Sequence, residues 1–364
     1  MKYLAVLGRQ PKISLAELES LFRDVKPSSQ NLAFFESGKI PDINRLGGTL
    51  KIAKLLDKQP IDLLRDLPEG KITLGVSDYS RGTNARKAGG EALKLKKIMS
   101  RHGRSVRVIP NKDTTLSTAT SHHNQLGEKQ NHIELIKVDN TWWEVIGVQN
   151  ITAYAKRDQA RPARDAKVGM LPPKLAQILI NLCGDLPKES ILLDPFCGTG
   201  VVLQEAMLMG YQPYGTDINE RMVEYSKKNL SWIGAEDLRT SVGDATSFQW
   251  QQPIHAIACE TYLGKPMSNV PVDIKLKTEK QECKTIILGF LKNISSQIDS
   301  STPLALAIPA WLKDNGEYSR LNILDEVETM GYNVKKFNNL GQKDLLYHRD
   351  GQIVAREIIV LRKK

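Results

Sequence analysis

The stretch of residues 191–209 constrains the fold of this chain more than any other part. Its apolar start, the letters ILL, predicts a buried strand that ends at Asp194. Gly198 and Gly200 predict a tight turn without side-chain bulk, and the apolar run after them predicts a helix. A strand, a glycine turn and a helix in this order bind nucleotide-like ligands at the carboxyl edge of an open α/β sheet. The glycines let the backbone approach the ligand, and the start of the helix offers free N–H groups.

The charge at the end of this strand indicates the kind of ligand. The stretch lacks the G-x-G-x-x-G run of dinucleotide-binding folds. Asp194 disfavours an anionic pyrophosphate and favours a ligand with a cationic sulfonium or ammonium group. The letters DPFCGTG, residues 194–200, resemble the first motif of class I S-adenosylmethionine methyltransferases, in the form found in nucleic-acid enzymes that methylate exocyclic amines. The alternative is a purely structural strand-to-helix turn.

The composition is that of a soluble globular protein. A length of 364 residues suggests two or three domains, and 41% hydrophobic with 25% charged residues allows sizeable cores. The apolar runs are too short to span a membrane. The four cysteines show no paired spacing, which argues for a reducing cytoplasm and against a zinc site. We therefore expect a cytoplasmic protein with no membrane partner and no metal.

The positive charge lies in the first half of the chain. The net charge is +10, and residues 1–185 carry 30 Lys and Arg against 19 Asp and Glu. Residues 186–364 carry 21 against 22. A basic half beside a neutral half suggests that one half holds a polyanion and the other modifies it. The alternative is a solvated lysine-rich surface.

The first half divides into two predicted α+β domains. Residues 1–65 are expected to form a ferredoxin-like domain, in which Ser14 caps a helix and Glu17 completes a capping box. The segment from residue 46 to residue 56 has apolar residues at helical spacing. In residues 66–150 the order of elements, with the phrases SVRVIP and LSTA, resembles the THUMP domain of RNA-modifying enzymes.

Residues 151–185 are expected to form a basic linker and a first helix. The run R-D-x-x-R-P-x-R-D followed by GMLPPKLA resembles the joining segment of THUMP-containing tRNA guanosine-N2-methyltransferases. In that family the last part of the segment lies against the cofactor, which implies a cofactor role for Met170 and Pro172. The basic residues expected to bind RNA are Arg107, Lys112, Arg157, Arg161, Arg164 and Lys167.

Acidic residues follow two further predicted strands in the methyltransferase half, residues 186–364. Asp217 suits two hydrogen bonds to ribose hydroxyls. In the methyltransferase pattern an acid placed like Asp244 receives the adenine amino group. The resemblance thus implies S-adenosylmethionine as the cofactor, bound by Met170, Pro172, Asp194, Phe196, Cys197, Gly198, Thr199, Gly200, Asp217, Ile218, Asp244 and Ala245.

The end of the fourth predicted strand departs from the family pattern. Relatives that modify amines carry Asp or Asn, two prolines and an aromatic residue there. This chain has Glu260 at the acidic place, no prolines, and Tyr262 one residue early. We assign Glu260 as the group that positions the target amine and accepts its proton, and Tyr262 as the residue that stacks on the base. The alternative is that Glu260 only caps the loop.

The sequence as a whole predicts an α/β protein. It comprises a Rossmann-like class I methyltransferase domain and an N-terminal α+β half, ferredoxin-like plus THUMP, that binds RNA. The resemblance implies methylation of the N2 amine of a tRNA guanosine, of the guanosine-10 type, without DNA as a partner. Two alternatives stay open: another acceptor such as ribosomal RNA or another exocyclic amine, and an inactive tRNA-binding protein with a methyltransferase fold. The need for an activator subunit cannot be read from the sequence.

Overall fold

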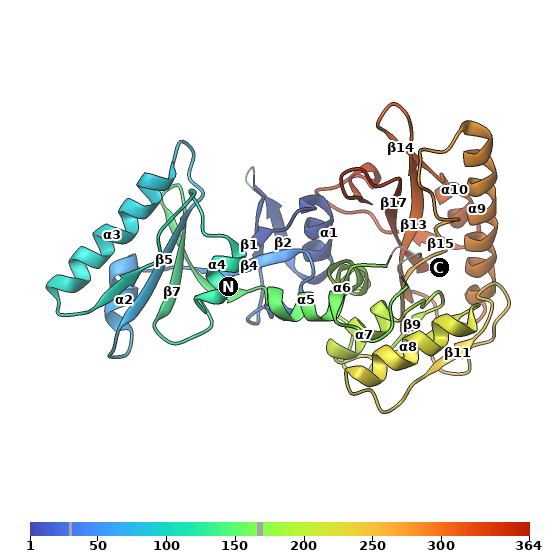
Figure 1. Cartoon of the computed structure of the whole chain (residues 1–364), viewed down its shortest axis with the longest axis horizontal. Coiled ribbons are helices and arrows are strands. Elements are labelled where there is room, and N and C mark those ends of the chain that lie inside the picture. The colour runs from blue at the N-terminus through green and yellow to red at the C-terminus, as the bar shows by residue number, and fades with distance from the viewer. Residues whose placement is uncertain (29–30, 166–169) are drawn as a thin grey trace. The chain divides into compact units, whose positions relative to one another are not determined.

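The computed structural model of this chain describes residues 1–28, 31–165 and 170–364. The chain divides into two compact units (Figure 1). Unit 1 comprises Met1–Leu18 and Phe22–Tyr154, and unit 2 comprises Glu19–Leu21 and Ala155–Lys364. In the ranges that the structure describes, no helix is long and apolar enough to cross a lipid bilayer.

Unit 1 is built on one eight-stranded sheet with the strand order β2-β3-β1-β4-β8-β7-β5-β6. Its strands are β1 (Lys2–Leu7), β2 (Arg23–Pro27), β3 (Leu32–Glu36), β4 (Thr49–Leu55), β5 (Ile72–Asp78), β6 (Val106–Val108), β7 (His132–Val138) and β8 (Thr141–Val148). The helices of this part of the chain are α1 (Pro11–Leu21), η1 (Ile43–Arg45), α2 (Pro60–Asp66), α3 (Ala85–Arg101), α4 (Thr118–His123) and α5 (Ile151–Gln159). The boundaries between the two units fall within α1 and α5. One sheet thus runs through both predicted N-terminal domains, and the THUMP assignment stays a prediction.

The start of α1 differs from the expected cap at Ser14. The helix begins at Pro11, so Ser14 lies inside it, and its hydroxyl donates to the Gln10 carbonyl at 2.9 Å. Glu17 does not close a capping box. Its carboxylate accepts the backbone N–H groups of Gly47 and Gly48 at 2.9 and 2.8 Å, a contact between distant parts of the chain that local pattern cannot indicate.

The segment expected to be helical after residue 46 is the strand β4. It lies in the middle of the sheet, between β1 and β8. The pairing with β8 shifts its register between Ile52 and Ala53, as at a β-bulge, and both of these consecutive residues are buried. The loss of alternation removed the signal for a strand and left apolar spacing that resembled a helix.

The sheet of unit 2 has the predicted Rossmann-like form. Its main strand order is β11-β10-β9-β12-β13-β17-β15, with β14 beside β13 and β16 beside β17. The pairs from β11 to β13 are parallel, and β17 is antiparallel to β13. The strand order reverses between β9 and β12, and an open α/β sheet binds ligands outside the carboxyl ends of the strands at such a point. The α/β fold class is therefore confirmed.

The elements of unit 2 follow the predicted alternation of strand and helix. Its strands are β9 (Ile191–Asp194), β10 (Gln212–Asp217), β11 (Thr240–Val242), β12 (Ala256–Glu260), β13 (Pro303–Leu312), β14 (Tyr318–Arg320), β15 (Tyr332–Val334), β16 (Leu346–Tyr347) and β17 (Val354–Lys363). Its helices are α6 (Pro173–Leu182), α7 (Val201–Leu208), α8 (Glu220–Trp232), α9 (Asp273–Ser295), α10 (Leu324–Thr329) and η2 (Gln342–Asp344).

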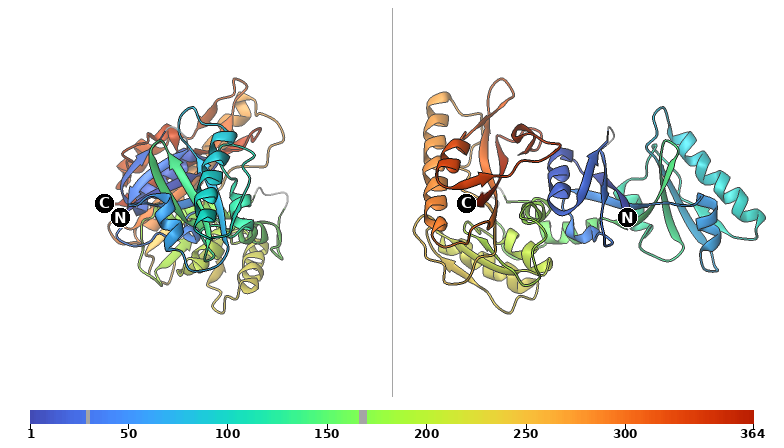
Figure 2. Two further views of the ribbon diagram at one scale, coloured as in Figure 1. Left: turned by 90° about the vertical axis from the view of Figure 1, so that its left-hand side faces the viewer. Right: turned by 180° about the vertical axis from the view of Figure 1, so that it is seen from behind.

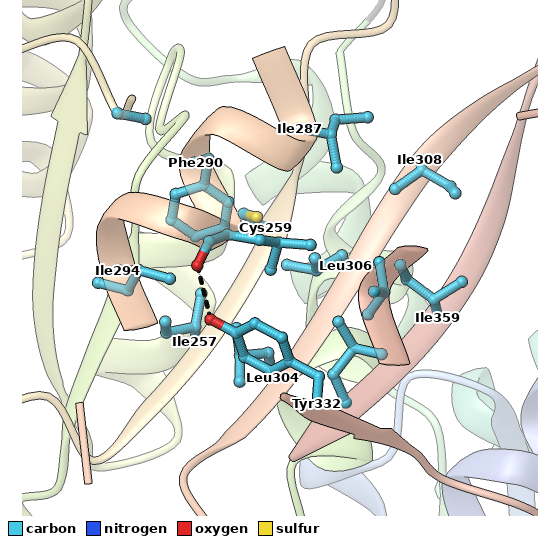
Figure 3. Packing of buried hydrophobic residues seen from close by; sticks show 14 of the residues in the cluster. Ile257, Cys259, Ile287, Phe290, Ile294, Leu304, Leu306, Ile308, Tyr332 and Ile359 are labelled. Carbon is cyan, nitrogen blue, oxygen red and sulfur yellow. Dashed lines mark hydrogen bonds between the residues drawn. The ribbon is translucent and has the colours of Figure 1, made fainter. Parts of the chain in front are cut away.

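Helices cover both faces of this sheet. The helices α6 to α8 contact β9 to β13 on one face, and α9, the long orange helix of Figure 2, covers the other. Ile287, Phe290 and Ile294 of α9 are fully buried among the apolar residues of β12, β13 and β17 (Figure 3). The hydroxyl of the buried Tyr332 donates to the Leu291 carbonyl at 2.8 Å, so this buried polar group has a hydrogen-bond partner (Figure 3).

Candidate active site

The glycine turn between β9 and α7 has the geometry that its sequence predicts. Gly198 and Gly200 have φ values of 50° and 81°, in the left-handed region that favours glycine. A Cβ atom on Gly200 would lie 2.4 Å from the hydroxyl of Ser226 on α8, so this position also lets two helices approach. The turn leads directly into α7, of which Gly200 is the N-cap.

Asp217, at the end of β10, holds the same turn in place. One of its carboxylate oxygens accepts the Gly198 N–H at 2.8 Å, and the other accepts the Asn219 N–H at 2.9 Å. Burial raises the pKa of this carboxyl, and the two N–H groups oppose that shift. An ionised carboxylate has about four acceptor positions, so hydroxyl groups of a ligand can still bind here.

A cavity opens at the carboxyl edge of the sheet, where the strand order reverses. Seven predicted site residues line it: Met170, Asp194, Phe196, Cys197, Gly198, Thr199 and Glu260. The structure thus brings together residues from the joining segment, the glycine turn and the end of β12. The walls are largely apolar, and two carboxyl groups face the same space, which suits a small ligand that carries a positive charge.

Asp194 is the most deeply buried acid of this cavity, with 2% of its surface exposed. Burial raises its pKa well above the usual range, and the neighbouring charges of Asp217 and Glu260 raise it further. In the part of the chain that the structure describes, the Phe196 N–H, at 3.1 Å, is the one hydrogen-bond donor to this carboxyl. A cationic ligand would offset both the burial and the repulsion among the acids.

Glu260 lines the cavity from the end of β12, but it is not an isolated acid. The Nε atom of Arg356 on β17 donates to its Oε1 atom at 2.6 Å. The Arg356 side chain is 5% exposed and that of Glu260 is 17% exposed, so the pair lies largely out of water. Burial raises the pKa of Glu260, and Arg356 opposes the shift.

Tyr262 is not among the described residues that line the cavity. Its ring is partly buried against the core below α9, and its hydroxyl donates to Glu282 on α9 at 3.2 Å. Burial and the nearby Glu282 raise the pKa of this phenol to about 12. A stacking role would require the ring to leave these contacts, so the assignment of Tyr262 stays a prediction.

Six other predicted cofactor residues are not among the described residues that line the cavity: Pro172, Gly200, Asp217, Ile218, Asp244 and Ala245. Pro172 is the N-cap of α6, and Ile218 is 71% exposed beyond the end of β10. Asp244 is exposed and accepts from the backbone and the hydroxyl of Thr246 at 2.8 and 2.7 Å. Ala245 is 4% exposed and belongs to the core.

Four lining residues were missed by the sequence reasoning: Leu171, Val201, Val202 and Met222. The position of Leu171 between Met170 and Pro172, two predicted cofactor residues, could have indicated its role. The two valines open the helix after the glycine turn, and their apolar character fits a core as well as a ligand wall. Met222 comes from α8, so only the tertiary structure could have indicated it.

Two arginines expected to bind RNA point into unit 2. Arg157 donates to both carboxylate oxygens of Glu205 on α7, at 2.7 and 3.2 Å. Arg161 is 3% exposed, its Nη2 atom lies 3.4 Å from the Met170 sulfur, and burial lowers its pKa. Both positions are at odds with the expected RNA contact, because a phosphate backbone needs accessible donors. Periodicity alone could not separate inward from outward arginines in this segment.

Three other basic residues are accessible. Arg107 and Lys112 are exposed on unit 1, and the Arg107 guanidinium has a weak contact of 3.4 Å with Asn124. Arg164 is exposed on unit 2 and donates to the Gln159 carbonyl at 3.2 Å. Lys167 lies outside the residues that the structure describes. The RNA contacts of this group stay predictions.

The chain is similar to known methyltransferases. Residues 161–282 match the family model described as RMKL-like, methyltransferase domain. Over 157 residues, 43% of this chain and 44% of the relative, it is 32% identical to the tRNA (guanine(10)-N2)-dimethyltransferase of Methanothermobacter thermautotrophicus. Over 167 residues, 45% of this chain and 44% of the relative, it is 33% identical to the enzyme of the same name from Pyrococcus abyssi. The chain thus matches less than half of the length of these relatives.

Among solved structures, TrmN from Thermus thermophilus aligns with the whole chain over its own whole length, at 16% identity and a TM-score of 0.48. A likeness this remote adds nothing to the topology already described. The matched segment 161–282 contains the glycine turn, Asp217 and Glu260. Residues 161–282 thus resemble an RMKL-like methyltransferase domain, and the chain is similar to tRNA (guanine(10)-N2)-dimethyltransferases over less than half of its length.

Proposed function

We propose that this protein transfers a methyl group from S-adenosylmethionine to the N2 amine of a guanosine in tRNA, of the guanosine-10 type. The observation that carries the proposal is the cavity where the strand order of the sheet reverses between β9 and β12. The glycine turn, Asp194 and Glu260 all line this cavity. The named activity of the two relatives supports the substrate. S-adenosylmethionine supplies an electrophilic methyl group on a sulfonium, which becomes a neutral thioether when the new N–C bond forms.

The residues of the cavity fit such a cofactor. Asp194 is buried beside two other acids with a single hydrogen-bond donor among the described residues, so a cation would satisfy it. Asp217 would receive ribose hydroxyls with the acceptor positions that Gly198 and Asn219 leave open. Phe196 and Met170 supply apolar walls that keep water from the reacting atoms.

The acceptor amine requires help from the protein. The lone pair of a guanine amine is delocalised into the ring, so the site must position the amine, stabilise the positive charge that forms and accept one proton. Glu260 lies at the end of β12 with the right charge for these tasks. The ion pair with Arg356 keeps its carboxylate in one orientation, which a positioned acceptor needs.

The RNA would be held through charge and shape. The first half of the chain carries the positive surplus, and Arg107, Lys112 and Arg164 are accessible to phosphates. A target base must leave its helix to reach a cavity of this kind. We propose further that the protein works in the cytoplasm, since its four cysteines are all free thiols.

One observation favours a second candidate, a tRNA-binding protein without catalysis. Arg356 forms an ion pair with Glu260, and the hydroxyl of Tyr262, which is not among the described lining residues, donates to Glu282. In that case the protein would bind the cofactor and tRNA and transfer nothing.

Mass spectrometry of nucleosides in tRNA from cells with and without the gene separates the two candidates. We expect methylated guanosine at the N2 position to disappear from one or more tRNAs when the gene is removed. Unchanged nucleosides, together with cofactor binding by the purified protein, would favour the non-catalytic candidate.

A further inference from the structure

A groove on unit 2 carries lysines that the proposed chemistry does not use. It runs between the first half of α9 and β14, which lie side by side in Figure 1. Its lining residues are Asp273, Leu276, Lys277, Lys280, Gln281, Lys284, Ser319 and Leu321.

Three lysines of the groove share one face of α9. Lys277, Lys280 and Lys284 follow one another at spacings of three and four residues, which align side chains along a helix. Lys277 is exposed, and Lys280 is half-buried with its ammonium 3.2 Å from the Ser319 hydroxyl. Neither has a carboxylate partner within the described part of the chain. Lys284 pairs with Glu326 at 2.5 Å.

A fourth lysine adds to the positive field. Burial lowers the pKa of Lys280, and the charge of Lys313, in the loop between β13 and β14, lowers it further. Acidic groups are also present, since Asp273 lines the groove and the same loop carries Asp314 and Glu317. An ammonium that is partly desolvated beside a second ammonium is stabilised by an anion that contacts both.

The groove lies at the same edge of the sheet as the cavity. β12 and β13 are parallel, so their carboxyl ends share one edge. β14 pairs with the last residues of β13, from Ala310 to Leu312. The loop that starts after Glu260, a residue of the cavity, ends where α9 begins at Asp273, a residue of the groove. An RNA that presents a base to the cavity would therefore pass close to this groove.

We propose that this groove binds the phosphodiester backbone of the RNA substrate, so that unit 2 itself contributes to RNA binding. The inference rests on the proposed function and names a contact surface for its substrate. Lys277 and Lys284 are seven residues apart, or about 10 Å along the helix. This separation is larger than one phosphate group, so the row of lysines suits an extended polyanion. The surface differs from the basic first half, to which the charge distribution alone assigned RNA binding.

The test compares the salt dependence of tRNA binding in the whole 364-residue chain and two variants of it. The first variant carries Lys277→Gln and Lys280→Gln together. The second, Lys292→Gln, changes an exposed lysine on the same helix outside the groove. Each phosphate contact contributes roughly 0.7 to 0.9 to the slope of log K against log salt concentration. We expect the double variant to lose about 1.5 from this slope by counterion release, whereas Lys292→Gln keeps the wild-type slope.

Cofactor affinity and melting temperature, measured on the same samples, should match the wild type in both variants. Equal slopes for the double variant and the wild type would overturn the inference even if the wild type methylates tRNA. Titration with inorganic phosphate tests a small anion instead: lysine-dependent phosphate binding with unchanged RNA slopes would also overturn it. A wild type that binds tRNA with the expected groove dependence but methylates nothing would leave the groove intact and refute the proposed function.

Discussion

The Nε atom of Arg356 donates to the Oε1 atom of Glu260 at 2.6 Å, and the two residues are 96 positions apart in the sequence. The pair joins the end of β12 to β17 at the edge of the cavity. Removing one partner of a buried ion pair leaves an uncompensated charge, which is strongly destabilising. The pair thus links the stability of unit 2 to the group that we assign to proton acceptance.

The first prediction concerns the charge of Glu260. Glu260→Gln keeps the shape and an acceptor oxygen for Arg356 but removes the negative charge. Single-turnover methyl transfer should fall by a factor on the order of 100 or more, the usual range for a positioned acid–base group. Cofactor and tRNA affinities, measured by calorimetry, should stay within about threefold of wild type, well under the tenfold that corresponds to about 1.4 kcal/mol. Transfer within threefold of wild type would move the role to another residue.

The second prediction concerns pH and Asp194. Because their pKa values are raised, Asp194 and Asp217 keep their protons in the folded protein over a pH range in which the unfolded chain has already released them. Without cofactor, the free energy of unfolding should therefore fall as the pH rises from about 4, the usual range of a carboxyl, through the raised pKa values. Asp194→Asn should flatten this dependence, raise stability at neutral pH and weaken S-adenosylmethionine binding tenfold or more.

Urea denaturation between pH 4 and pH 8 measures the first effect, and calorimetry measures the second. An identical pH dependence in Asp194→Asn and wild type would show that this acid is not the buried titrating group. Unchanged cofactor affinity would remove Asp194 from the cationic site.

The third prediction concerns the ribose contacts of Asp217. Asp217→Ala should cost on the order of 1–3 kcal/mol of cofactor binding, since it leaves hydrogen-bond partners unpaired. Part of the loss would come from the turn, because Asp217 also accepts the Gly198 and Asn219 N–H groups. Asp217→Asn, which retains one acceptor oxygen, serves as the matched control and should lose less affinity. If Asp217→Ala binds the cofactor as tightly as wild type, the assignment of this strand end is wrong.

The fourth prediction separates structural from RNA-facing arginines. Glu205 is 1% exposed and paired with Arg157, so Arg157→Gln should lower the free energy of unfolding by on the order of 3 kcal/mol, as for a broken buried pair. Its effect on the salt slope of tRNA binding should be negligible. Arg107→Gln, at an exposed position of unit 1, should do the reverse: little change in stability and a lower slope. The opposite pattern would show that Arg157 reaches the RNA.

The residues that the sequence could place are those whose environment is local. The strand, glycine turn and helix around Asp194 lie within twenty residues, and the acid at Asp217 follows from the same unit of structure. Glu260 could be placed at a strand end by the pattern of its own segment. The sequence could not indicate its partner Arg356. That contact depends on the antiparallel pairing of β17 with β13, and no local pattern predicts the register of this pairing.

Two differences between the sequence-based expectation and the structure have the same origin. The apolar residues of β4 predict a helix because they do not alternate with polar ones, and the alternation is interrupted where the pairing with β8 shifts its register. Arg161 was expected to face RNA because its segment is basic, although the fold buries it beside Met170. In both cases the decisive contact joins parts of the chain that the sequence separates.

The most direct test of the account is methyl transfer by the purified protein to an unmodified tRNA transcript, with methyl-labelled S-adenosylmethionine and nucleoside analysis of the digested product. We expect label in N2-methylated guanosine. We also expect no transfer when the target guanosine is replaced by inosine, which lacks the N2 amine. Label in any other nucleoside, transfer to the inosine-containing tRNA, or no transfer to any tRNA would contradict the account.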